Sequence, residues 1–169
     1  MTDETTTEIR HEVVVDVDVE RAFWTFADLD RIKPREHNLL GVPIEATVVE
    51  QREGGDIYDR GTDGSVCRWA RVLVWDPPHR FVFSWDIGPD WRIADDLANT
   101  SEVEVRFTPR SDETGPDALP RTRVELTHRH LDRHGENWTG VRDGVDNPQG
   151  WPLYLSRFVG AATSTHPAT

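Results

Sequence analysis

Apolar and polar residues alternate along several short stretches of the chain, and these stretches predict its strands. Across residues 9–17 every second position carries Ile, His or Val, which is the period-two pattern of a strand with one buried face. Asp18 follows as a helix N-cap. An apolar stripe then recurs at intervals of three and four residues, at Val19, Ala22, Phe23 and Phe26. We therefore predict a strand at 9–17 and an amphipathic helix that ends near Asp28.

Six more strands are predicted, and no long helix separates them. The β-rich or alternating stretches lie at 44–50, 56–60, 68–75, 80–87, 102–109 and 122–130. Breaker residues between them predict a short helix or irregular chain at 29–43, a turn of helix at 92–99 and a solvated loop at 111–120. Strands that follow one another in this way form an antiparallel meander.

The hairpin at 68–87 carries three of the seven tryptophans and forms the centre of this meander. Pro77 and Pro78 cannot donate to a strand ladder, so they mark the turn. Strict alternation places four side chains on one face of the first strand, Trp69, Arg71, Leu73 and Trp75, and three on one face of the return strand, Phe81, Phe83 and Trp85. Burying each large apolar side chain stabilises a fold by about 1.5–3 kcal/mol, so we expect these faces to be covered.

The C-terminal part of the chain has helical periodicity and supplies the cover. A short stripe runs through 138–145, Asp146-Asn147-Pro148 breaks the pattern, and a longer stripe follows at Trp151, Leu155, Phe158, Val159 and Ala162, with Pro148 or Pro152 in the first turn of its helix. An antiparallel sheet of this length twists and curls, and one long helix can close its concave face. We predict an α+β protein in which a curved antiparallel sheet of six to seven strands wraps around the C-terminal helix and leaves a cavity beneath it.

Composition narrows the class of protein. The 169 residues fit one domain, 1–169, with an ordered core of about 9–162. A net charge of −12, with the acidic residues spread along the chain, argues against nucleic acid as a partner. The single cysteine, Cys67, excludes an internal disulfide. We see no leader and no apolar run of membrane-spanning length, so we expect a cytoplasmic protein with no membrane partner.

Several motifs, in order, resemble one superfamily. They are the Gly54-Gly55 turn, Val72-Leu73 running into Asp76-Pro77-Pro78, the Phe81-to-Trp85 strand, the strand at 122–128, and Gly150-Trp151 at the start of the last helix. Together they are similar to the SRPBCC superfamily of START-like and birch-pollen-allergen-like proteins, in the branch named for activators of the Hsp90 ATPase. The resemblance covers about 9–162. It implies a helix-grip fold whose cavity takes apolar or aromatic small molecules.

The candidate ligand-binding residues are the aromatic and polar side chains expected near that cavity. Trp75 and Trp138 are further candidates for its wall, since such sites are apolar concavities with a few orienting polar groups. We expect His128 or Arg71 to orient the ligand. The full candidate set is Asp59, Trp69, Arg71, Trp85, His128, Trp151 and Tyr154.

Other chemistry finds weaker support in the sequence. His128 and His130 can share a strand face, but His134 lies beyond the strand, so we expect no metal site and no cofactor. Cys67 has no base within sequence reach, and no serine lies in a Gly-x-Ser-x-Gly elbow. An acid–base pair of His128 with Asp59 or Glu50 stays open, because folding can bring distant residues together.

Three functions follow from these observations. The leading hypothesis is binding of a small hydrophobic or aromatic molecule without catalysis. The second is an enzyme of the cyclase, dehydratase or hydrolase kind, which two titratable groups facing each other in the cavity would favour. The third is a co-chaperone-like interaction module, which a large exposed apolar patch outside the cavity would favour. The choice between monomer and homodimer stays open.

Overall fold

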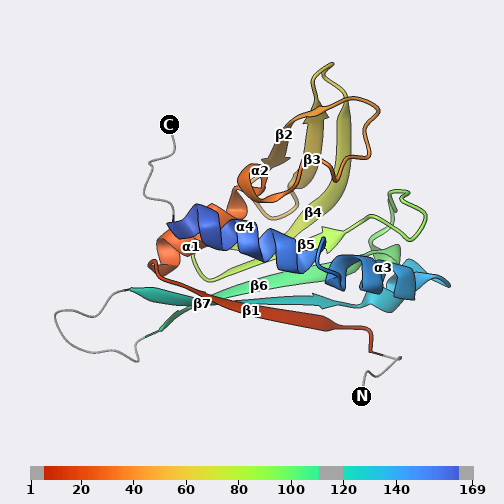
Figure 1. The fold of residues 1–169 in the computed structure, drawn as a ribbon. Helices are drawn as coiled ribbons and strands as arrows, with labels where there is room; N and C mark the ends of the chain where they lie inside the picture. The colour runs from red at the N-terminus through yellow and green to blue at the C-terminus, as the bar shows by residue number, and fades with distance from the viewer. Residues whose placement is uncertain (1–5, 111–119, 164–169) are drawn as a thin grey trace.

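The computed structural model describes residues 6–110 and 120–163, and its elements follow the predicted order (Figure 1). The predicted loop at 111–120 lies outside this part of the chain except for Pro120. Asp18 caps the first helix as expected, because its Oδ1 accepts a hydrogen bond of 2.8 Å from the Arg21 N–H. The elements are β1 (Ile9–Val15), α1 (Val19–Ala27), α2 (Leu29–Ile32), β2 (Ile44–Val49), β3 (Asp56–Gly61), β4 (Val66–Asp76), β5 (Arg80–Trp85), η1 (Leu97–Asn99), β6 (Ser101–Arg110), β7 (Arg121–Arg129), η2 (Leu131–His134), α3 (Trp138–Asp146) and α4 (Trp151–Thr163).

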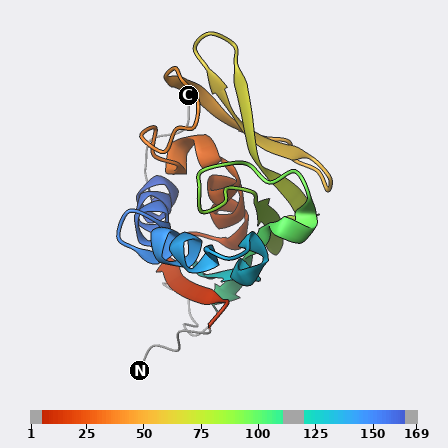
Figure 2. The same cartoon turned by 90° about the vertical axis from the view of Figure 1, so that its right-hand side faces the viewer.

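The seven strands form one antiparallel sheet in the order β1-β7-β6-β5-β4-β3-β2. β1 joins the far edge beside β7, and the other six strands follow in sequence order. The sheet curls, and α4 lies across its concave side with α1 beside it (Figures 1 and 2). The predicted α+β helix-grip fold is confirmed. Across residues 6–110 and 120–163, no helix is both long enough and apolar enough to span a membrane.

β4 bends the sheet and corrects one of our predictions. Its first half pairs with β3 and its second half with β5, and the register shifts at Trp69 and again at Leu73. Each shift inserts one extra residue, and such bulges bend a strand and reset which face its side chains occupy. Trp69 and Trp75 therefore face the interior, but Arg71 does not: its side chain lies on the outer face, where it approaches Asp86. The prediction that strict alternation holds along β4 is wrong.

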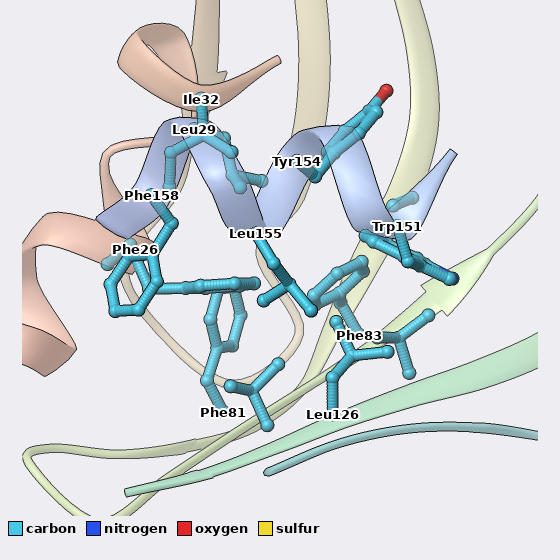
Figure 3. Packing of buried hydrophobic residues seen from close by; sticks show 14 of the residues in the cluster. Phe26, Leu29, Ile32, Phe81, Phe83, Leu126, Trp151, Tyr154, Leu155 and Phe158 are labelled. Carbon is cyan, nitrogen blue, oxygen red and sulfur yellow. The ribbon is translucent and has the colours of Figure 1, made fainter. Parts of the chain in front are cut away.

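The core lies between the sheet and the helices α1 and α4 (Figure 3). On α4, Phe158, Leu155 and Trp151 point toward the sheet, whereas Tyr154 points to the other side of the helix. Phe158 packs edge-on against Phe26 of α1, with ring centroids 5.4 Å apart. The C-terminal helix thus covers the aromatic face of the sheet as predicted, and the first turns of α4 place aromatic side chains at the end of the core.

Candidate ligand-binding cavity

A cavity of about 570 Å³ opens beside the N-terminal end of α4. The sheet contributes one wall through β3, β4 and β5, and α3 contributes another. The connection after α2 and the loop after β5 form the remaining sides. Its size falls within the range of about 300–1,000 Å³ that is usual for small-molecule sites.

Three buried tryptophans form a continuous aromatic wall. Trp69 of β4 and Trp85 of β5 have ring centroids 5.5 Å apart, and Trp85 and Trp151 of α4 lie 5.4 Å apart. Both pairs are edge-to-face, an arrangement that stabilises aromatic pairs by about 0.5–1.5 kcal/mol beyond simple burial. The wall is apolar and is built from three different elements, so folding assembles it.

Two glycines leave the α3 wall of the cavity without side chains. A Cβ atom built at Gly140 or at Gly144 would meet no atom within 4 Å, and both residues line the cavity. Glycine inside a helix costs roughly 0.5–1 kcal/mol relative to alanine. Gly150, before α4, has no room for a side chain, because a Cβ there would lie 2.1 Å from the Val145 carbonyl oxygen. These glycines widen the cavity and allow α3 and α4 to meet closely.

A buried ion pair closes one end of the cavity. Lys33 Nζ lies 3.0 Å from Asp59 Oδ2, and both side chains are almost fully buried. Asp59 Oδ1 accepts hydrogen bonds from Thr47 Oγ1 at 2.7 Å and from the Trp69 indole N–H at 3.3 Å. Lys33 also donates to the His37 carbonyl oxygen. The carboxylate is therefore fully engaged, and it holds one tryptophan of the wall in place.

A second polar pair lies against the cavity. His37 Nδ1 is 2.9 Å from the Tyr154 hydroxyl, and the two rings stack with centroids 5.6 Å apart. Burial lowers the pKa of His37 below its usual 6.5, and the Lys33 charge lowers it further. Burial, and then the negative charge of Asp59, raise the pKa of Tyr154 well above its usual 10. At neutral pH the pair therefore consists of a neutral imidazole and a protonated phenol.

His128 lies behind the tryptophan wall and orients it. The Trp151 indole N–H donates to His128 Nδ1 at 3.0 Å, so the His128 proton is on Nε2, which donates to Ser101 Oγ at 2.6 Å. The Ser101 hydroxyl can then donate to His134 Nε2 at 2.7 Å. Burial lowers the pKa of His128 to about 3 and that of His134 to about 4. Both rings are neutral at physiological pH, and the chain of hydrogen bonds fixes the angle of the Trp151 ring.

The structure brings most of the sequence-predicted site residues together. Five of the seven line the cavity, namely Asp59, Trp69, Trp85, Trp151 and Tyr154. Arg71 and His128 are not among the described residues that line it. The β4 bulges turn Arg71 outward, and the Trp151 ring covers His128. Neither side chain is therefore placed to orient a ligand in the cavity.

Two further tryptophans that we considered for the wall pack elsewhere. Trp75 lies against Phe23 and Phe81 in the core, and Trp138 carries the Arg142 guanidinium over its ring at 5.2 Å. Sequence reasoning also missed Lys33 and His37, both in the connection predicted to be irregular. Lys33 is the only lysine of the chain, but its burial is visible only in the structure, and nothing in the sequence marks His37.

In the described part of the chain, the geometry does not favour the other chemistries that we considered from the sequence. Within residues 6–110 and 120–163, no group of three or more His, Cys, Asp or Glu side chains converges as a metal site would require. Burial raises the pKa of the Cys67 thiol, which disfavours its nucleophilic thiolate form. The ring nitrogens of His128 bond to Ser101 and Trp151, so they do not pair with Asp59.

A curled antiparallel sheet that grips a C-terminal helix, with a cavity between them, places this protein in the helix-grip class of the SRPBCC superfamily. Within that class, the chain belongs to the family described as activator of Hsp90 ATPase homolog 1-like proteins, whose family model matches residues 16–162. No curated protein matches the sequence.

Solved structures agree with this membership. An anthrahydroquino-gamma-pyrone synthase, Txn09, is 33% identical, covering 95% of this chain and 99% of its own, with a TM-score of 0.62. CalC, a self-sacrificing resistance protein from Micromonospora echinospora, is 28% identical over 92% of this chain and 93% of its own, with a TM-score of 0.63. An AHSA1-like protein from Aeromonas hydrophila, at 16% identity, 96% and 99% coverage and a TM-score of 0.54, shares the fold.

Proposed function

We propose that the chain binds a planar aromatic small molecule in this cavity. The observation that carries the proposal is the tryptophan wall of Trp69, Trp85 and Trp151, which lines a cavity that Gly140 and Gly144 of α3 also line without side chains. A flat ring system can stack on this wall, and the polar groups at the Lys33 and His37 end can bind its oxygen atoms. The naming of Txn09 as a synthase of an aromatic pyrone supports this ligand class.

Filling the cavity from the glycine side tests the proposal. We expect wild-type protein to bind 1,4-dihydroxyanthraquinone, a planar tricyclic probe, in isothermal titration calorimetry. Gly144→Phe should weaken binding at least about tenfold, because the new ring occupies the open space beside α3. The proposal would be contradicted if this variant bound the probe with unchanged affinity, or if the wild-type protein showed no binding of the probe.

The matched control is Gly160→Phe. Like Gly144, Gly160 is an exposed helical glycine with no atom within 4 Å of a built Cβ, but it does not line the cavity. Both variants add the same side chain in place of a helical glycine. Only the one in α3 should change the affinity, and both should keep the helical circular dichroism signal of the wild type.

A second candidate function is a proton-transfer enzyme of the polyketide cyclase type. The observation that favours it over binding alone is the contact of His37 with Tyr154 beside the ligand space. With His37 Nδ1–H donating to the Tyr154 oxygen, the phenol can donate its own proton toward a carbonyl oxygen of the ligand, and His37 Nε2 is free to accept a proton from the adjacent carbon. The product of that step is an enol, the species from which carbon–carbon ring closure proceeds.

Hydrogen–deuterium exchange tests this candidate without knowledge of the natural substrate. We expect the protein to accelerate exchange of the α-hydrogens of 1-tetralone, followed by NMR in D₂O. Tyr154→Phe and His37→Gln should each reduce the acceleration about a hundredfold, the usual contribution of one general acid or base. Because the pKa of His37 is lowered, the neutral base persists below pH 6.5 and the exchange rate should hold into mildly acidic solution. Exchange equal in wild type and variants would leave binding without catalysis as the function.

A further inference from the structure

Trp91 has two energetically unfavourable features that packing does not explain, an exposed aromatic ring and a left-handed backbone. Its side chain is 74% exposed, more than any other large apolar side chain in the part of the chain that the structure describes. Its backbone also has φ of 64°, in the left-handed region that bulky residues rarely adopt. Exposed aromatic surface and left-handed backbone both oppose stability, and such strain concentrates at ligand-binding positions. The residue therefore calls for a functional explanation.

A short turn places Trp91 at the mouth of the cavity. Gly88 N–H donates to the Arg92 carbonyl oxygen at 2.9 Å, and Trp91 N–H donates to the Gly88 carbonyl oxygen at 3.1 Å. The turn belongs to the connection between β5 and β6, which lies beside α3 in both views (Figures 1 and 2). Trp91 lines the cavity while most of its ring stays exposed.

A second exposed apolar side chain lies at this mouth. Leu39, the other exposed large apolar residue among the cavity-lining residues, comes from the connection after α2. Leu39 and Trp91 thus offer apolar surface from two separate segments, outside the buried tryptophan wall. A ligand confined to the buried wall would leave both side chains in water.

We propose that Trp91 is a ligand-contacting residue that covers the outer end of a planar aromatic ligand and selects it over a saturated molecule of similar size. The inference deepens the proposed function and rests on it. It implies that the ligand is long enough to reach from the buried tryptophan wall to the mouth, so that one part is enclosed and another stacks on the Trp91 ring. Aromatic stacking needs a flat π-face on the ligand, which a saturated ring system lacks.

Two probes and three substitutions test this assignment. By titration calorimetry, Trp91→Ala should weaken binding of 1,4-dihydroxyanthraquinone about tenfold, while Trp91→Phe, which keeps a stacking face, should stay within about threefold of wild type. Binding of tetradecahydroanthracene-1,4-diol, a saturated molecule with the same three-ring carbon skeleton as the aromatic probe, should change by less than about twofold in either variant. Trp91 contributes the part of the wild-type tryptophan emission that is missing from Trp91→Phe. When the aromatic probe binds to the wild-type protein, this emission should shift to shorter wavelengths, because the Trp91 ring leaves water.

Trp91→Gly separates a ligand contact from a structural role. Glycine adopts φ of 64° without strain, so the melting temperature should equal or exceed that of the wild type while affinity for the aromatic probe falls as in Trp91→Ala. If Trp91→Ala and Trp91→Gly bind the aromatic probe as tightly as wild type while Gly144→Phe does not, the assignment of Trp91 is overturned and the cavity proposal stands. If Gly144→Phe also binds normally, the proposed function fails with it.

Discussion

Replacing Asp59 with leucine is expected to lower the free energy of unfolding by about 3–5 kcal/mol, the usual cost of removing one partner from a buried ion pair. The substitution leaves the Lys33 ammonium buried, with the His37 carbonyl oxygen as its remaining described acceptor. It also removes the acceptor for the Thr47 hydroxyl and the Trp69 indole N–H. Urea denaturation at neutral pH should show a lower midpoint with an unchanged slope.

Two comparisons isolate the buried charge as the cause. The double variant Lys33→Met with Asp59→Leu should recover a large part of the loss, because no unpaired charge remains inside. Glu45→Ala removes one partner of the exposed Arg60–Glu45 pair, which has an N–O distance of 3.2 Å, and should cost less than about 1 kcal/mol. A loss in Asp59→Leu as small as that in Glu45→Ala would contradict our account of the cavity end.

The Lys33–Asp59 pair also shows which buried residues a local sequence pattern can predict and which it cannot. Asp59 was predicted from the period-two pattern of its strand, because that pattern depends only on neighbouring residues. Lys33 was not, because its burial depends on how the connection after α2 folds over β3, which no local periodicity encodes. The irregular connections carry functional side chains here, as they do in many proteins, and their conformation is set by tertiary contacts.

β4 illustrates why a correct strand prediction can still misplace a residue. The span predicted at 68–75 lies within the observed strand, Val66–Asp76, and its turn residues were also placed correctly. Bulges at Trp69 and Leu73 shift the register twice, so the side chains at positions 69, 72 and 75 share the interior face. A bulge leaves no reliable mark in a single sequence, and one is enough to reverse every subsequent assignment of faces.

Helix α4 was the easier case. Its apolar stripe at Trp151, Leu155 and Phe158 repeats with the helical period, and the aromatic faces of the sheet required a cover. The three residues point toward the sheet as that pattern predicts (Figure 3). Tyr154 was a candidate too, but its partner His37 lies 117 positions away in sequence, so only the folded chain reveals that the phenol has an imidazole beside it.

Acidification is expected to destabilise the protein before its carboxylates titrate. The pKa of His128 is about 3 in the folded protein, because the ring is completely buried, and is near 6.5 in an unfolded chain. Below pH 6.5 the unfolded chain therefore binds a proton that the folded protein does not. Each pH unit in this range should lower the free energy of unfolding by about 1.4 kcal/mol. The stabilisation is complete above pH 6.5 and is lost progressively as the pH falls toward 3.

His134 acts in the same direction, with a folded pKa of about 4, but adds less because it is partly accessible to solvent. Asp86 acts in the opposite direction, since burial raises its pKa and protonation relieves a buried charge. Urea denaturation between about pH 7 and pH 5 avoids most carboxylate titration and reports mainly the histidines. His128→Gln, which keeps a neutral hydrogen-bonding side chain, should be less stable at neutral pH and should show a shallower dependence on pH. An equally steep dependence in that variant would exclude His128 as its source, and with it the view that a buried, neutral imidazole holds Trp151 in the cavity wall.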